Sequence, residues 1–187
     1  NNKTFFEFEV NGFNVNDYIY RKDALKLDRF AQFAMGAAEE GIKDSGLDLE
    51  QEDKTKIGVV VASGIGGLST FEEEVMGYDK ERGPRFNPFF IPKMISDIAA
   101  GHISMKYGFH GPNYSTASAC ASSTNALIDA AHLIRLGKAN VIIAGGAEAS
   151  ICAAGVGGFN MMNALSTRND DAERASRPFS ASRDGFV

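Results

Sequence analysis

The sequence lacks several features that would place it in a specialised class of protein. It has no tryptophan and only two cysteines and five prolines in 187 residues, and it contains no repeat of fixed period and no proline-rich linker. Its hydrophobic content of 44% is too high for a disordered or low-complexity chain, and the few prolines exclude a collagen-like one. We therefore expect one globular domain, or part of a larger one.

The sequence also lacks a net positive charge, long apolar runs and clusters of cysteines. The formal net charge of −5 argues against nucleic acid as the main partner, because phosphate binding needs a concentrated Lys and Arg surface. No uncharged apolar stretch approaches the roughly 20 residues that span a bilayer, so no membrane partner is expected. Cys120 and Cys152 lie far apart without metal-ligand spacing. This pattern predicts no metal site and indicates a reducing compartment, so we expect the protein in the cytoplasm.

The apolar pattern predicts alternating helices and strands. We expect helices over residues 24–45, 69–78, 94–107 and 120–136, and strands over residues 57–62, 114–118 and 141–144. Pro88 and Pro92 predict an extended segment between them, because each proline restricts the residue before it. Alternation of this kind is typical of an α/β layered fold, in which we expect a mixed sheet.

Cys120 is the strongest candidate for chemistry among the individual residues. It lies where a strand meets a helix, in the stretch SACASS of residues 118–123. Apolar residues cover most of that helix, so we expect it to be buried, with its N-terminus in a low-dielectric interior. A helix N-terminus favours the nucleophilic thiolate, and backbone N–H groups at such a turn can face an oxyanion. The alternative is that Cys120 is a small buried core residue, as we expect of Cys152.

The histidines and the glycine loop point less clearly to chemistry. We expect His102 in the core, His110 in a turn, and His132 roughly 16 Å along the helix from Cys120, which is too far for direct proton exchange. The glycine loop at residues 64–67 follows a strand, as in dinucleotide sites, but the third glycine of that fingerprint is absent. A nucleotide site is therefore not favoured.

Four motifs together resemble the β-ketoacyl-acyl-carrier-protein synthases, most closely those that elongate bacterial fatty acids. They are SACASS at 118–123, IAGGAEA at 143–149, ALSTRN at 164–169 and SRDGFV at 182–187. The resemblance covers essentially the whole chain. It implies a thiolase-like layered αβαβα fold made of two halves, of which residues 1–187 form the N-terminal one, apparently truncated at both ends. The catalytic histidines of the family lie in the other half, so we expect this segment alone to be inactive.

The resemblance also implies a reaction and roles for individual residues. These enzymes act as homodimers and perform a decarboxylative Claisen condensation of acyl and malonyl thioesters. Cys120 would accept the acyl group, and no cofactor is implied beyond the phosphopantetheine of acyl-carrier protein. The residues that match the acyl pocket are Ile65 as its gate, Ala119, Gly155 and Phe159 as its walls, and Phe90, which would reach towards the partner subunit.

A basic cluster is a candidate docking surface for the acidic carrier protein. Arg21, Lys22 and Lys26 gather at one helix start, and Asp23 and Asp28 lie among them. A lattice of surface salt bridges is the alternative interpretation of this cluster.

Other functions remain open at this point. A ketosynthase of a polyketide pathway shares the cysteine motif. A non-catalytic subunit that sets chain length is disfavoured by Cys120, which such relatives lack. A degradative thiolase acting on coenzyme A esters is disfavoured by the motifs that follow Ala147.

Overall fold

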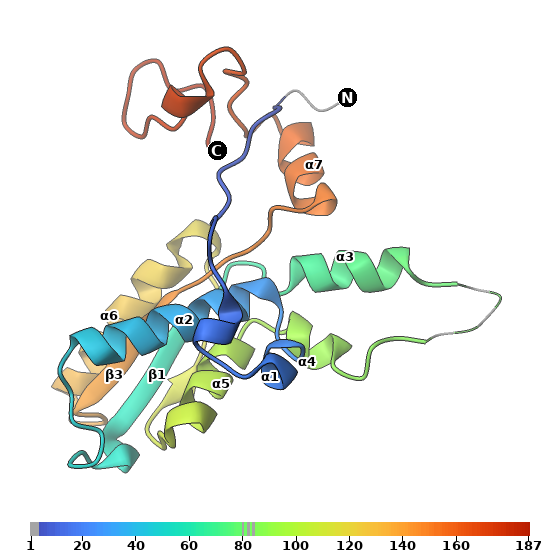
Figure 1. Cartoon of the computed structure of the whole chain (residues 1–187). Helices are drawn as coiled ribbons and strands as arrows, with labels where there is room; N and C mark the ends of the chain where they lie inside the picture. Colours follow the sequence, from blue (N-terminus) through green and yellow to red (C-terminus); the bar gives the residue numbers. More distant parts are fainter. Residues whose placement is uncertain (1–3, 80, 82, 84) are drawn as a thin grey trace. The chain divides into compact units, whose positions relative to one another are not determined.

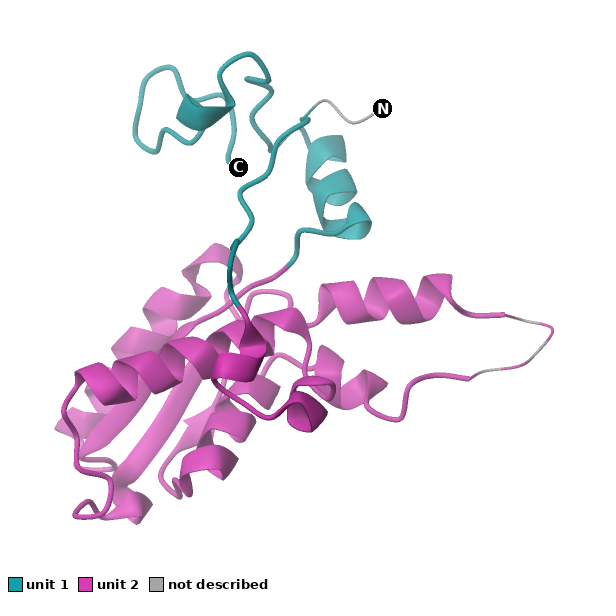
Figure 2. Cartoon of the chain, in the orientation of Figure 1, with its two compact units in different colours: residues 1–13, 150–187 teal, residues 14–149 magenta. Residues whose placement is uncertain are grey.

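The computed structural model describes residues 4–79, 81, 83 and 85–187. The chain forms two compact units, which Figure 2 distinguishes by colour. The larger unit consists of residues Asn14–Ala149, and the smaller one combines Asn1–Phe13 with Ser150–Val187. No described helix has both the length and the apolar character needed to cross a membrane.

The larger unit is built on a three-stranded parallel sheet (Figure 1). Strand β1 (Ile57–Ala62) lies in the centre, between β2 (Asn113–Tyr114) and β3 (Val141–Gly146). The predicted central strand is confirmed, and all six of its residues are buried. The expected mixed sheet is not found among the described strands, which all pair in parallel. Each connection between them contains a helix, and this returns the chain to the same end of the sheet.

Helices cover both faces of this sheet. Helices α2 (Arg29–Asp44) and α5 (Ile98–Tyr107) pack on one face, and α6 (Ser122–Arg135) packs on the other. Successive β1 residues alternate between them, because Val59 joins the cluster with α2 and α5, whereas Val60 joins the cluster with α6. The resulting α/β/α layers agree with the first half of the expected layered fold.

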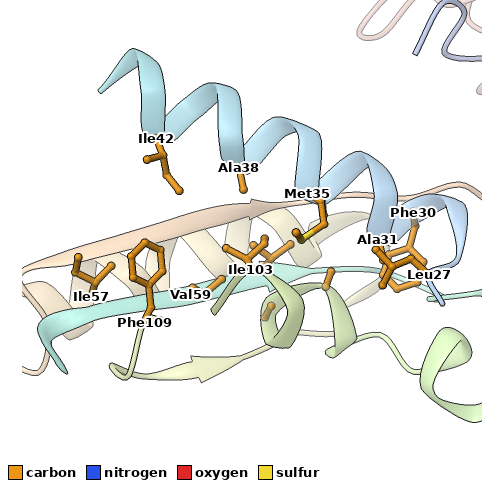
Figure 3. Packing of buried hydrophobic residues seen from close by; sticks show 14 residues of the cluster. Leu27, Phe30, Ala31, Met35, Ala38, Ile42, Ile57, Val59, Ile103 and Phe109 are labelled. Atoms are coloured by element: carbon orange, nitrogen blue, oxygen red, sulfur yellow. The ribbon is translucent and has the colours of Figure 1, made fainter. Parts of the chain in front are cut away.

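The main hydrophobic core lies between α2, α5 and the sheet (Figure 3). Phe30 and Ile103 are fully buried there. Figure 3 shows Ala38 and Ile42 pointing from α2 towards the strands, and their spacing of four residues keeps them on one helix face. The helix ends where predicted, because Gly46 takes a φ of +67° just beyond it.

The segment between β1 and α5 differs from the prediction. It contains α3 (Leu68–Met76) and α4 (Phe90–Met94), so the extended segment expected at residues 88–92 is wrong. Pro92 is the third residue of α4. The N–H groups of a first helical turn have no intrahelical partner, so proline at this position removes no helix hydrogen bond.

Helix α6 is buried on one face only, which contradicts the prediction of a helix buried nearly all round. Its buried residues Ser122, Ala126 and Ala130 recur every four positions against the sheet. Leu127 and Ile128 are 55% and 46% exposed. The apolar composition of α6 was identified correctly, but no layer of described residues covers its outer side.

The smaller unit contains α7 (Ala153–Met161) and the 3-10 helix η4 (Ala172–Arg174). Its centre is the fully buried Ser166, whose N–H donates to the Phe186 carbonyl at 2.8 Å and whose Oγ donates to Asp184 at 2.9 Å. Thr4 Oγ1 donates to the Ser166 carbonyl at 2.7 Å. An ideal Cβ on Gly185 would lie 2.3 Å from the Ser166 nitrogen, so glycine is required for this approach.

Candidate active site

Cys120 lies in a tight turn between β2 and α6. The residue before it, Ala119, has a φ of +50°, a left-handed conformation that costs an alanine roughly 1–2 kcal/mol. A 3-10 turn, η3 (Ala119–Ala121), then leads directly into α6 at Ser122. The predicted placement of Cys120 between a strand and a helix is confirmed.

Polar side chains of the same segment hold this strained turn. Ser122 Oγ donates to the Ala119 carbonyl at 2.6 Å and accepts from the Ser118 N–H at 2.9 Å. Thr116 Oγ1 donates to the Ser122 carbonyl at 2.8 Å, and Asn125 Nδ2 donates to Ser118 Oγ at 2.6 Å. Because Ser122 is only 4% exposed, its hydroxyl is an integral part of the turn.

The side chain of Cys120 is exposed. The expected burial of the helix N-terminus in a low-dielectric interior is therefore wrong for this chain. Within the described part of the chain, the backbone N–H of Cys120 has no hydrogen-bond acceptor, which leaves it available to an oxyanion. Cys152, expected in the core, is only partly buried, at the N-cap of α7.

A glycine loop (residues 63–67) follows β1 and lies beside this turn. An ideal Cβ on Gly64 would be 3.4 Å from the Ala119 carbonyl oxygen, so the two segments are in contact. An ideal Cβ on Gly66 or Gly67 would come within 2.5 Å of a carbonyl oxygen near the end of α4. The glycines therefore let the loop fit between the turn and α4.

Glu148 holds this loop, and the sequence reasoning had assigned it no role. Its Oε2 accepts the N–H groups of Gly64 at 2.8 Å and Ile65 at 3.1 Å. Ser63 Oγ lies 3.3 Å from both carboxylate oxygens. Glu148 follows β3 and the loop follows β1, so both extend from the carboxyl ends of neighbouring parallel strands. Sites of α/β proteins usually form at this edge, and that position was the signal available in the sequence.

Two further residues of the expected acyl pocket lie around the same loop. Ile65, the expected gate, is 47% exposed. Phe90 lies on α4, whose end contacts the loop, and it stacks on Phe71 and Phe86 at centroid distances of 6.2 and 5.4 Å. Tyr78 extends this row of rings by stacking on Phe86 at 5.8 Å. Four residues to which the resemblance assigns a role thus lie in one region of the larger unit. They are Cys120, Ile65, Ala119 and Phe90 on α4.

The other two expected wall residues belong to the smaller unit. Gly155 is buried within α7, and Phe159 packs edge to face on Phe186 at 5.0 Å. Their assignment to an acyl pocket remains a prediction.

The basic cluster is only partly neutralised. Arg21 and Lys22 are exposed on helix α1 (Arg21–Ala24), and neither forms a salt bridge among the described residues. Lys26 pairs with Asp23 at 2.9 Å, and this hydrogen bond is the main reason that the pKa of Asp23 is lowered, although the charge of Lys22 also helps to lower it. Asp28 takes no part in a surface lattice, because it is buried and caps α2.

No histidine is joined to Cys120 by a hydrogen bond among the residues that the structure describes. His102 is partly buried on α5, and this burial lowers its pKa, although the negative charge of Asp23 opposes the shift. In residues 4–79, 81, 83 and 85–187, no three His, Cys, Asp or Glu side chains are grouped so that they could hold a metal ion.

Comparison with known proteins covers almost the whole chain. Residues 5–187 match the family model of the beta-ketoacyl synthase N-terminal domain. The 3-oxoacyl-[acyl-carrier-protein] synthase 2 of Staphylococcus aureus is 44% identical over an alignment of 183 residues, and the match covers 96% of this chain and 44% of the relative. The chain therefore spans less than half the length of the curated relatives it matches.

Solved structures share the fold. A beta-ketoacyl synthase from Burkholderia phymatum has a TM-score of 0.83 and 28% identity, and the match covers 100% of this chain and 46% of that one. A ketosynthase solved in complex with its type II polyketide acyl-carrier protein has a TM-score of 0.76 and 23% identity, covering 84% of this chain and 46% of that one. At that identity the second likeness concerns the fold alone.

Proposed function

The chain belongs to the beta-ketoacyl synthase family, whose N-terminal domain it matches, and on this premise we propose that the whole protein is a 3-oxoacyl-[acyl-carrier-protein] synthase of fatty-acid elongation. The observation that supports this most directly is the strained turn that presents the exposed thiol of Cys120 at the start of α6. The 44% identity to a relative of that name supports the choice of reaction.

Cys120 is the proposed acyl acceptor. Its thiolate attacks the carbonyl carbon of an acyl thioester on carrier protein, and a new carbon–sulfur bond forms. The bond to the phosphopantetheine sulfur then breaks, and that sulfur leaves and takes up a proton. Attack on the carbonyl carbon produces a tetrahedral oxyanion, and the free backbone N–H of Cys120 is its proposed hydrogen-bond donor. Donors that face such an oxyanion stabilise the transition state and contribute strongly to catalysis.

The second stage forms the new carbon–carbon bond. A malonyl thioester on carrier protein loses carbon dioxide, and the electron pair of the broken bond remains as a carbanion next to the thioester. This carbanion attacks the acyl carbonyl on Cys120 and expels the thiolate. The product is a 3-oxoacyl thioester two carbons longer. The family resemblance places the histidines of this stage outside residues 1–187, and the reaction as proposed needs no cofactor beyond phosphopantetheine.

The acyl chain is proposed to enter past Ile65. The exposed side chain of Ile65 on a loop that contacts Ala119 supports a gating role. Ala119, Gly155 and Phe159 are the proposed walls, and Phe90 is proposed to complete the pocket of a partner subunit in a homodimer. The row of exposed aromatic rings along α3 and α4 supports such a contact.

Acyl-carrier protein is the proposed macromolecular partner. Arg21 and Lys22 are exposed and form no salt bridge among the described residues, so they can attract an acidic protein. The ketosynthase solved with its carrier protein shares the fold of this chain. The cytoplasm is the proposed location, and the two free cysteines of residues 1–187 are in keeping with a reducing compartment.

The proposed function is tested by the intact mass of the full-length protein after incubation with acyl-loaded carrier protein. We expect the mass to rise by one acyl group in the wild type and in Cys152→Ala, and to stay unchanged in Cys120→Ala. Cys152→Ala is the matched control, because it removes the second thiol of residues 1–187. A wild type that takes up no acyl group, or an adduct that survives Cys120→Ala, would contradict the proposal.

A further inference from the structure

The loop that carries Ile65 has an acceptor for each of four consecutive backbone N–H groups. Those of Gly64 and Ile65 donate to Glu148 Oε2 at 2.8 and 3.1 Å. The N–H of Gly66 donates to Ser63 Oγ at 2.9 Å, and the following one donates to a carbonyl at the end of α4 at 3.0 Å. The loop backbone cannot shift without breaking some of these bonds.

Glu148 provides the strongest part of this restraint. One carboxylate oxygen receives two successive N–H groups, and hydrogen bonds to a carboxylate are stronger than those to a neutral acceptor. The hydroxyl of Ser63, which is 2% exposed, lies within hydrogen-bond distance of the same carboxylate and also accepts from Gly66. Glu148 therefore holds three of the four N–H groups, two directly and one through Ser63.

The carboxylate is itself fixed to the sheet. Glu148 comes just after β3, and β3 pairs with β1 over six residues, from the pair Ile57 and Val141 to the pair Ala62 and Gly146. The loop comes just after β1. Both partners are thus anchored to one pair of strands, so the contact between Glu148 and the loop is set by the register of the sheet.

The side chain of Ile65 contrasts with its backbone. It is 47% exposed and belongs to neither hydrophobic cluster. Hydrogen bonds hold its backbone, whereas neither cluster packs around its side chain. A gate built in this way opens by rotation about side-chain bonds, and its position depends on what fixes the backbone.

We propose that Glu148 is a positioning residue for acyl-chain selection, which fixes the backbone of Gly64 and Ile65 so that the Ile65 side chain discriminates between acyl chains. The proposal rests on the proposed function, in which Ile65 gates the acyl pocket. Glu148 acts through the loop and not on the reacting atoms.

The test compares acyl transfer to Cys120 from carrier protein loaded with a butanoyl or a tetradecanoyl chain, in the full-length protein. In Glu148→Gln the side chain keeps its shape, but it loses the charge, and an NH2 donor replaces one of its two acceptor oxygens. We expect the ratio of the two transfer rates to change about fivefold or more, since a lost charge-assisted hydrogen bond has effects of this size or larger. Glu148→Asp keeps the charge on a shorter side chain and should give a smaller change.

Two controls separate positioning from general damage. Alkylation of Cys120 by iodoacetamide, a small reagent that needs no acyl pocket, should keep its rate within about twofold in Glu148→Gln, because the turn around Cys120 has its own hydrogen bonds. Glu50→Gln, an exposed carboxylate with no hydrogen bond to its side chain among the described contacts, should leave both rates unchanged. An unchanged rate ratio in Glu148→Gln would overturn the proposal.

The Ile65→Ala background shows whether Glu148 acts through Ile65. In that background Glu148→Gln should change the rate ratio by less than about twofold. An equal change in both backgrounds would overturn the proposal. If the wild type acylates Cys120 and the ratio is unchanged, only the role of Glu148 fails. If the wild type takes up no acyl group, the proposed function fails and the role of Glu148 fails with it.

Discussion

Asp28 caps two helices with one buried carboxylate. It is 3% exposed, and its Oδ1 accepts from the Phe30 N–H at 3.2 Å as the N-cap of α2. Its Oδ2 accepts from the N–H and the hydroxyl of Thr70 at 3.1 and 2.6 Å. Thr70 is the third residue of α3, whose N-cap, Gly67, has no side chain to cap it. The first turns of α2 and α3 are therefore joined through a single side chain.

Removal of this carboxylate should destabilise the protein. Asp28→Ala loses a helix cap, which costs about 1 kcal/mol, and leaves buried donors of Thr70 without an acceptor, which costs a further 1–3 kcal/mol or so. We expect the free energy of unfolding of the full-length protein to fall by about 2–4 kcal/mol in urea denaturation. Asp44→Ala, at the exposed end of α2, is the control and should change stability by about 0.5 kcal/mol or less. Equal losses in the two variants would show that Asp28 has no special role.

The short helix α1 determines which residues of the basic cluster are exposed without a salt bridge. Helix α1 has only four residues, Arg21–Ala24, and it exposes two cations that form no salt bridge with a described acidic side chain. On the same stretch, Lys26 is held by Asp23, and its Nζ lies 5.9 Å from the centroid of the Phe89 ring. Arg21 and Lys22 are therefore the charges most available to a partner.

Reversal of one of these charges should weaken carrier-protein binding. In Lys22→Glu we expect the Kd for acyl-carrier protein to rise about tenfold at low salt and less at high salt, because screening reduces the attraction. Isothermal titration calorimetry at two salt concentrations measures both effects. Lys138→Glu, beyond the end of α6, makes the same charge change elsewhere and should leave the Kd within about twofold. Unchanged affinity of Lys22→Glu at low salt would rule out this docking surface.

Large apolar surfaces of the described chain lie open. The aromatic row along α3 and α4 includes Phe71, Tyr78 and Phe86, each between 40% and 44% exposed, and the outer side of α6 adds Leu127 and Ile128. Monomeric proteins rarely expose contiguous apolar surface of this kind unless it mediates binding. The row of rings is the surface that we assign to the proposed homodimer.

The proposed dimer should weaken when this row is interrupted. Phe86→Ser removes the central ring, which stacks on both Tyr78 and Phe90. Loss of a buried aromatic side chain from an interface costs about 2 kcal/mol, so the dimer Kd should rise roughly thirtyfold. Sedimentation velocity over a range of concentrations measures this in the full-length protein. Met105→Ser, an exposed apolar position on α5, is the control, and a dimer equally stable in both variants would place the interface elsewhere.

Local sequence was sufficient to predict several of the elements and the turn that carries Cys120. The apolar run of β1 and the stop at Gly46 depend on neighbouring residues, and the structure confirms them. The helix predicted over residues 24–45 begins only at Arg29, because the short helix α1 ends at Ala24. The position of Cys120 between strand and helix follows from the same local pattern. Family membership could also be inferred from the motifs, because they are contiguous stretches of the chain.

Contacts between distant residues were decided only by the tertiary structure. Glu148 and Gly64 are separated by 84 positions and Asp28 and Thr70 by 42, and no local pattern indicates that either pair meets. The face of α6 that becomes buried was likewise unpredictable. Its apolar residues surround the helix, whereas burial depends on which layers pack against it. The periodicity of a sequence indicates which residues share one face of a helix or strand. Which residues of another element that face contacts depends on the order and register of the strands.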